Sequence, residues 1–94
     1  MPEKIPEEIL LTRLKKIPEW EIKKGRLVRR FEFDEFMEGI DFVNGVAEIA
    51  DEANHHPDII IRYNVVTLSL TTHDSGGITS RDFELAARVD TLMD

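Results

Sequence analysis

The feature that most constrains the fold is a long stretch of helical periodicity in the middle of the chain, about Glu35 to Asn54. Asp34 is placed to cap its start, and Pro57 ends it. Two apolar stripes run along this helix, roughly 110° apart at ~100° per residue. They consist of Phe36, Ile40, Val43, Ala47 and Ala50, and of Phe42, Val46, Ile49 and Ala53. One stripe is enough to cover a sheet, so the second predicts burial against another subunit or against a terminal helix of the same chain.

Alternating apolar and polar residues predict one β-hairpin before this helix and one after it. In both hairpins the turn contains residues that favour turns, glycine in the first and asparagine in the second. The first hairpin joins 19–23 to 27–33 across Lys24-Gly25, and the second joins 59–63 to 65–72 across Asn64.

Shorter helices are expected at both ends of the chain. Pro6 opens the first helix and Pro18 stops it. Thr79 begins a capping-box pattern, with Asp82 in place of the usual glutamate, ahead of a final helix. That helix is expected to bury Leu85, Ala86, Val89, Leu92 and Met93. The element order αββαββα predicts an α+β fold, with helices on one face of a four-stranded antiparallel sheet, in a single domain spanning residues 1–94.

The composition excludes several classes of function. The formal charge of −7, from 12 basic and 19 acidic residues, argues against direct nucleic-acid binding. Without cysteine the chain has neither a disulfide framework nor a thiolate metal site. It shows no apolar run of bilayer length and no secretory-type start, so a cytoplasmic protein without a membrane partner is expected.

All three histidines, His55, His56 and His73, lie in one third of the chain, which indicates a single site. Histidine can give and take protons near neutral pH. For the first two, the alternative is a role as cations at a helix C-terminus. Zinc binding is a rival, but neighbouring helical residues point ~100° apart and no further ligand cluster completes a site. No metal is therefore predicted.

Four other residues can be interpreted either as parts of the site or as structural residues. Asp51 lies four residues before His55, so the two share a helix face and are expected to pair. Asp82 is read first as a capping residue, and Tyr63 as a cross-strand packing residue. Trp20 is either a core residue or the wall of a site for a flat heterocycle.

The spacing of these residues resembles the signature of the pterin-4a-carbinolamine dehydratase family. The pattern contains an acid, a His-His-Pro triplet, an aromatic residue, a third histidine and a second acid. In this chain it runs Asp51, three residues, His55-His56-Pro57, five residues, Tyr63, nine residues, His73, eight residues and Asp82. The resemblance extends to Trp20, to residues 24–33 and to the final helix, and it implies the same α+β fold.

The resemblance implies a dehydratase that removes water from 4a-hydroxytetrahydropterin to give quinonoid dihydropterin, without a cofactor, as part of tetrahydrobiopterin recycling. It implies that His55 and His73 form an acid–base pair and that His56 mainly binds substrate with a smaller catalytic part. Asp51 and Asp82 would be orienting residues. The remaining substrate contacts that it implies are Asn54, Thr71, Thr72, Asp74 and Trp20.

The resemblance also implies partners. A homodimer through edge strands or a homotetramer through the long helix is expected. Members of the family in animals double as dimerisation cofactors of a homeodomain transcription factor. A non-catalytic dimerisation or coactivator-type module is therefore an alternative function, as is an accessory protein acting on another pterin.

Overall fold

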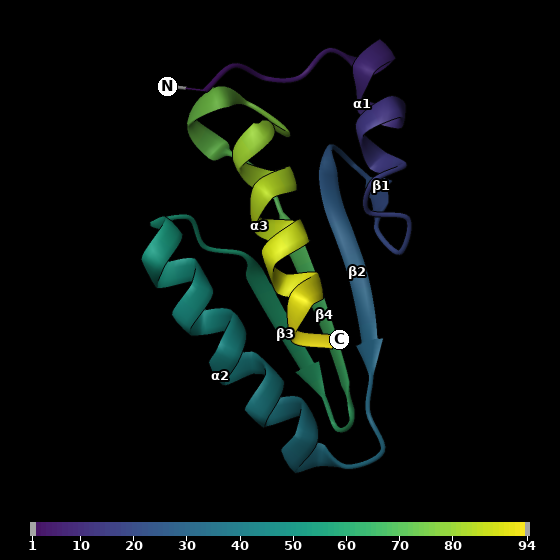
Figure 1. Ribbon diagram of the computed structural model, residues 1–94, viewed down its shortest axis with the longest axis vertical. Coiled ribbons are helices and arrows are strands. Elements are labelled where there is room, and N and C mark those ends of the chain that lie inside the picture. The colour runs from purple at the N-terminus through teal and green to yellow at the C-terminus, as the bar shows by residue number, and fades with distance from the viewer. Residues whose placement is uncertain (1, 94) are drawn as a thin grey trace.

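The computed structural model describes residues 2–93, and its element order confirms the predicted αββαββα arrangement (Figure 1). Short 3-10 turns, η1 (His73–Ser75) and η2 (Thr91–Met93), precede and follow the last helix. The helices and strands are α1 (Glu7–Leu14), β1 (Glu21–Lys23), β2 (Arg26–Glu32), α2 (Phe36–Ala53), β3 (Asp58–Arg62), β4 (Val65–Leu70) and α3 (Ser80–Asp90).

The four strands form one antiparallel sheet in the order β1-β2-β4-β3, with α2 and α3 side by side on one of its faces (Figure 1). The register pairs Leu27 with Leu70, and places Phe31 opposite Val66. Because side chains alternate along a strand, these residues all point toward the helices, where they are buried. The predicted α+β fold is thus confirmed.

Aromatic rings join the sheet to the helices in the core. The Phe31 ring lies 4.6 Å from that of Phe42 on α2, and 6.2 Å from that of Trp20 in an edge-on arrangement. Such tilted and edge-on pairs add to the free energy gained by apolar burial. The second apolar stripe of α2, with Phe42 and Val46, is therefore the one that covers the sheet.

The first stripe of α2 is covered much less completely. Phe36 is 43% exposed and Ala47 is exposed, whereas Ala50 is buried at the other end of the stripe. The stripe was expected to pack against another subunit or against a terminal helix of the same chain. The terminal helix α3 leaves the start of the stripe exposed.

Glu35, not Asp34, is the N-cap of α2. The Glu35 backbone N–H donates to Oε1 of Glu38 at 3.0 Å, which forms a capping box. The prediction of Asp34 was wrong because the box needs an acceptor side chain three residues beyond the cap, and Glu38 occupies that place relative to Glu35.

Three further element boundaries differ from expectation. The helix α1 ends at Leu14, before Pro18. The helix α3 ends at Asp90, so Leu92 and Met93 are exposed in η2 and not buried as expected. Tyr63 lies in the turn between β3 and β4, with φ +52° and 70% exposure. It cannot extend β3 because Arg62 already pairs with Val65, which leaves only two residues for the hairpin turn.

The positive φ of Tyr63 generates a stability prediction. The left-handed region costs a non-glycine residue ~1–2 kcal/mol, and the added flexibility of glycine costs ~0.5–1 kcal/mol. Because Tyr63 is mostly exposed, we expect Tyr63→Gly to raise the free energy of unfolding by about 0.5–1 kcal/mol in urea titrations. Tyr63→Ala, which keeps a Cβ, is the control and should give no such gain. Equal stability of the two variants would contradict backbone strain at this turn.

Candidate active site

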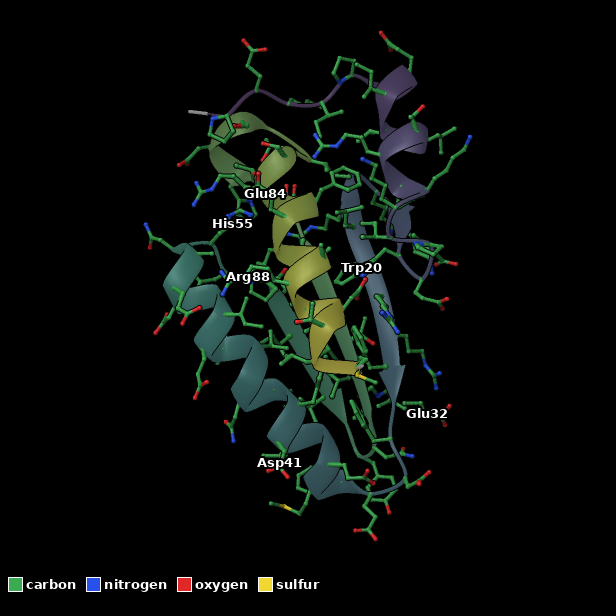
Figure 2. The ribbon with its side chains drawn as sticks, in the orientation of Figure 1. Trp20, Glu32, Asp41, His55, Glu84 and Arg88 are labelled. Carbon is green, nitrogen blue, oxygen red and sulfur yellow. The ribbon has the colours of Figure 1, made fainter. Side chains whose placement is uncertain are left out.

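The helix α2 ends in a left-handed turn that sets the direction of the first histidine. Asn54, its C-cap, has φ 51° and ψ 43°, a conformation that asparagine adopts more readily than most residues. The chain therefore leaves the helix axis before His55, and Pro57 prevents the helix from resuming. Figure 2 shows His55 at the end of α2, on the side toward α3. Its side chain is buried, with 9% of the residue exposed.

His55 is held by a carboxylate from α3. Its Nε2 lies 2.5 Å from Oδ1 of Asp82, which is 0% exposed. Because a carboxylate only accepts hydrogen bonds, Nε2 carries the proton and donates it. This arrangement fixes the ring orientation and the tautomer, and it leaves Nδ1 as the nitrogen that can take up or release a proton.

Asp82 is also the hub of a buried hydrogen-bond network. Its Oδ2 accepts from the Thr72 hydroxyl at 2.8 Å and from the Thr79 backbone N–H at 2.9 Å. The hydroxyls of Thr72 and Thr79 lie 2.8 Å apart. Asp82 therefore caps α3, as expected, and binds His55 at the same time. Among the described residues, no buried side-chain polar atom lacks a partner.

This network brings the third histidine into the same region. Thr72 follows the end of β4 and immediately precedes His73, which is exposed at the start of η1. The loop is closed by backbone hydrogen bonds between Thr72 and Gly77. The Asp82 carboxylate thus ties the end of α2, with His55, to the segment that carries His73.

Asp51 does not pair with His55, contrary to expectation. Its Oδ1 lies 3.0 Å from Nε2 of His56, and both side chains are exposed. The four-residue spacing would join Asp51 to His55 only if the helix continued through that residue, but it stops at Asn54. Any orienting effect of Asp51 in this structure therefore falls on His56.

Trp20 occupies the core and offers no face to a ligand. It is 2% exposed, and its Nε1–H donates to Oδ1 of Asp90 at 2.9 Å. The same oxygen accepts from Arg29 at 2.7 Å. Figure 2 shows Trp20 beside α3 and β2. Its expected role as a wall for the substrate is thus corrected, because the indole is enclosed by the packing of α3 on the sheet.

The other residues expected to contact the substrate differ in exposure and in hydrogen bonding. The side chains of Asn54 and Asp74 are exposed. The Thr72 hydroxyl is engaged with Asp82, so only its backbone remains available. The Thr71 hydroxyl makes a long contact of 3.4 Å to the Gly25 carbonyl.

Sequence reasoning missed Arg81. Its Nη2 donates to the carbonyl of Asn54 at 2.8 Å and makes a longer contact to that of Ala53 at 3.4 Å. The only feature of the sequence that pointed to Arg81 is its position next to Asp82, because residues that bind backbone carbonyls follow no spacing rule. Arg81 and Glu84 also line a cavity of about 100 Å³ next to His55. Small-molecule sites usually enclose ~300–1,000 Å³, so this cavity is too small to enclose a ligand of that kind.

Residues 2–93 contain neither a cluster of metal ligands nor a membrane-spanning helix. No group of three or more histidine and acidic side chains there is arranged to hold a metal ion. Across the same residues, the helices fall short of the length and apolarity needed to span a bilayer.

The fold and the site together define a small α+β domain in which a buried histidine–carboxylate pair joins the end of α2 to the start of α3. The sequence profile described as pterin 4 alpha carbinolamine dehydratase matches residues 3–92. The chain therefore belongs to the pterin-4a-carbinolamine dehydratase family.

Individual relatives agree with this membership. A protein of Picosynechococcus sp. is 47% identical over 98% of this chain and 100% of its own length, and one of Thermomicrobium roseum is 49% identical over 95% and 96%. Both carry, provisionally, the name pterin-4-alpha-carbinolamine dehydratase.

Two solved structures share the fold. One is described as a transcriptional coactivator/pterin dehydratase from Brucella melitensis, with a TM-score of 0.93, 24% identity, and 98% and 100% of the two chains covered. The other is a pterin dehydratase-like protein identified as a RuBisCO assembly factor in the alpha-carboxysome, with a TM-score of 0.64, 27% identity, and 78% and 84% covered.

The two aspartates that face histidines should differ sharply in their effect on stability. We expect Asp82→Ala to lower the free energy of unfolding by ~3–5 kcal/mol, because it removes one partner of a buried, hydrogen-bonded pair and the cap of α3. Asp51→Ala removes only an exposed contact to His56 and should leave the urea midpoint unchanged. Equal midpoints for the two variants would contradict the buried network.

Proposed function

We propose that this protein removes water from 4a-hydroxytetrahydropterin to give quinonoid dihydropterin. The proposal is supported by the family membership and, above all, by the carboxylate of Asp82, which joins the segments of His55 and His73. Two imidazoles near one flat substrate would supply an acid and a base at neutral pH.

The dehydration requires one proton donor and one proton acceptor. The carbon–oxygen bond at the 4a position breaks, and the leaving hydroxyl takes a proton from an imidazolium and departs as water. The other imidazole takes the proton of the adjacent ring nitrogen, whose electron pair forms the new carbon–nitrogen double bond. Positioned acid–base groups contribute ~10²–10⁴-fold each, and the step needs no redox partner.

The roles that the family resemblance implies are compatible with the exposure and hydrogen bonding of the three histidines. His55, whose Nε2–H donates to Asp82, would act through Nδ1, the ring nitrogen that Asp82 does not hold. The exposed His73 would act from the opposite side of the substrate. His56, supported by Asp51, would mainly bind the ring. The polar amide edge of the pterin would be recognised by Asn54, Asp74 and the backbone of residues 71–72.

Substitution of the acid–base pair tests this proposal. His55→Gln, whose amide can still donate to Asp82, and His73→Ala should each lower the dehydration rate by ~10²-fold or more while the thermal midpoint stays close to that of the wild type. His56→Ala should mainly raise KM. The measurement is stopped-flow absorbance on freshly prepared carbinolamine. Wild-type rates in both His55→Gln and His73→Ala would end the assignment.

A second candidate function is a binding module without catalysis. The observation that favours it is the first turn of α2, where Phe36 of the first stripe and the neighbouring Met37 are both exposed. One structural neighbour is described as a RuBisCO assembly factor, and the other as a transcriptional coactivator as well as a pterin dehydratase. Packing of identical subunits would use the same surface, through α2 or through the edge strands.

Mass measurement by light scattering separates these possibilities. We expect a closed homodimer or homotetramer, and Phe36→Glu together with Met37→Glu should lower the mass if α2 forms the interface. An unchanged mass would assign the contact to an edge strand such as β3. A monomeric wild type would contradict the proposed oligomer and would favour capture of a different partner by α2.

A further inference from the structure

Arg81 reaches from the first turn of α3 to the end of α2, where the chain turns toward His55. Its guanidinium donates to the carbonyl of Asn54 at 2.8 Å. The last carbonyls of a helix lack intrahelical partners and carry the negative end of the helix dipole, so a cation is favoured there. The contact therefore satisfies an acceptor in the peptide group that precedes the histidine.

The carbonyl that Arg81 holds belongs to the same peptide unit as the nitrogen of His55. On its other side that nitrogen donates to the carbonyl of Ala50 at 3.1 Å. The peptide is thus fixed at both its oxygen and its N–H. Because a peptide unit is planar, fixing both groups also fixes where the Cα of His55 lies.

The two residues that hold His55 are adjacent on one helix. Arg81 holds the main chain before the histidine, and Asp82 holds its ring at 2.5 Å. The backbone N–H of Arg81 also donates to the Thr79 hydroxyl, within the cap of α3. The first turn of α3 therefore holds both the main chain before His55 and the imidazole ring of His55. A displacement of the end of α2 by an ångström would lengthen the His55–Asp82 hydrogen bond beyond its normal range.

We infer that Arg81 is a positioning residue, which holds the Asn54–His55 peptide so that the imidazole of His55 meets Asp82 in one orientation. The effect of Arg81 on the dehydration rate rests on the proposed function, whereas its effect on the orientation of the His55 imidazole does not. The competing role is direct contact with the substrate, since Arg81 also lines the small cavity beside His55. The two roles differ in what happens to His55 when no substrate is present.

The first test is nitrogen NMR of the histidine side chains in the free protein, with the His55 signals assigned through His55→Gln. The wild type should show His55 as a single tautomer, protonated at Nε2, with a slowly exchanging proton. Arg81→Gln should give mixed tautomers or fast exchange, and Arg81→Lys should retain part of the wild-type pattern. Arg13→Gln is the matched control. Its half-buried guanidinium lies 4.9 Å over the Phe83 ring on the same turn of α3, but this contact involves neither histidine segment.

The second test is steady-state kinetics of the same variants, each checked for folding by its thermal midpoint. Arg81→Gln should lower kcat by ~10-fold or more with little change in KM, because misplacement of a catalytic group by about 1 Å can cost 10²-fold. Arg81→Lys should recover part of the loss, and Arg13→Gln should match the wild type. Arg81→Lys also serves if Arg81→Gln does not fold.

Two results would overturn the inference. One is an unchanged His55 spectrum in both Arg81 variants. The other is a raised KM at unchanged kcat, which would make Arg81 a substrate contact. If the wild type fails to dehydrate the carbinolamine, the proposed function fails, while the spectra still decide the role of Arg81.

Discussion

The arrangement around the candidate site depends on one buried carboxylate. Asp82 has no exposed surface, yet it accepts hydrogen bonds from His55, from the Thr72 hydroxyl and from the backbone of Thr79. An isolated charge in such a place would be costly, and the donors around it offset that cost. Each donor comes from a different part of the chain. The carboxylate therefore fixes the relative positions of the end of α2, the end of β4 and the start of α3.

A second carboxylate fixes the other end of α3. Asp90 stands in the last turn, where the helix dipole disfavours an anion. Arg29 of β2 and the indole of Trp20 both donate to its Oδ1, and Arg29 also lies over the Phe31 ring. The helix α3 is thus attached to the sheet at one end and to the histidine segments at the other. This arrangement accounts for the burial of Trp20, which serves packing and not ligand binding.

Polar and apolar side chains are exposed at opposite ends of α2. His56, just beyond the end of α2, is exposed, as is His73 in η1, whereas the start of α2 exposes the apolar side chains of Phe36 and Met37. The structural neighbours carry descriptions as different as pterin dehydratase and RuBisCO assembly factor. A shared fold does not fix function, so the chemistry of the histidines, and not the architecture, carries the proposal of catalysis.

The sequence alone determined the features that depend on local periodicity and spacing. Alternation identified the hairpins and the buried faces of β2 and β4, the Thr79–Asp82 spacing identified the capping box, and the histidine pattern identified the family. These features need only neighbouring residues, or a signature shared by the family.

The tertiary structure decided which groups meet. In the structure Asp82 pairs with His55, and Asp51 pairs with His56. The left-handed conformation of Asn54 ends the helix before His55, so Asp51 and His55, four residues apart, do not share a helix face. The tertiary structure also enclosed Trp20 and brought Arg81 to the carbonyl of Asn54. Partners far apart in the chain follow from how helices pack on a sheet, and no periodicity within one segment encodes that packing.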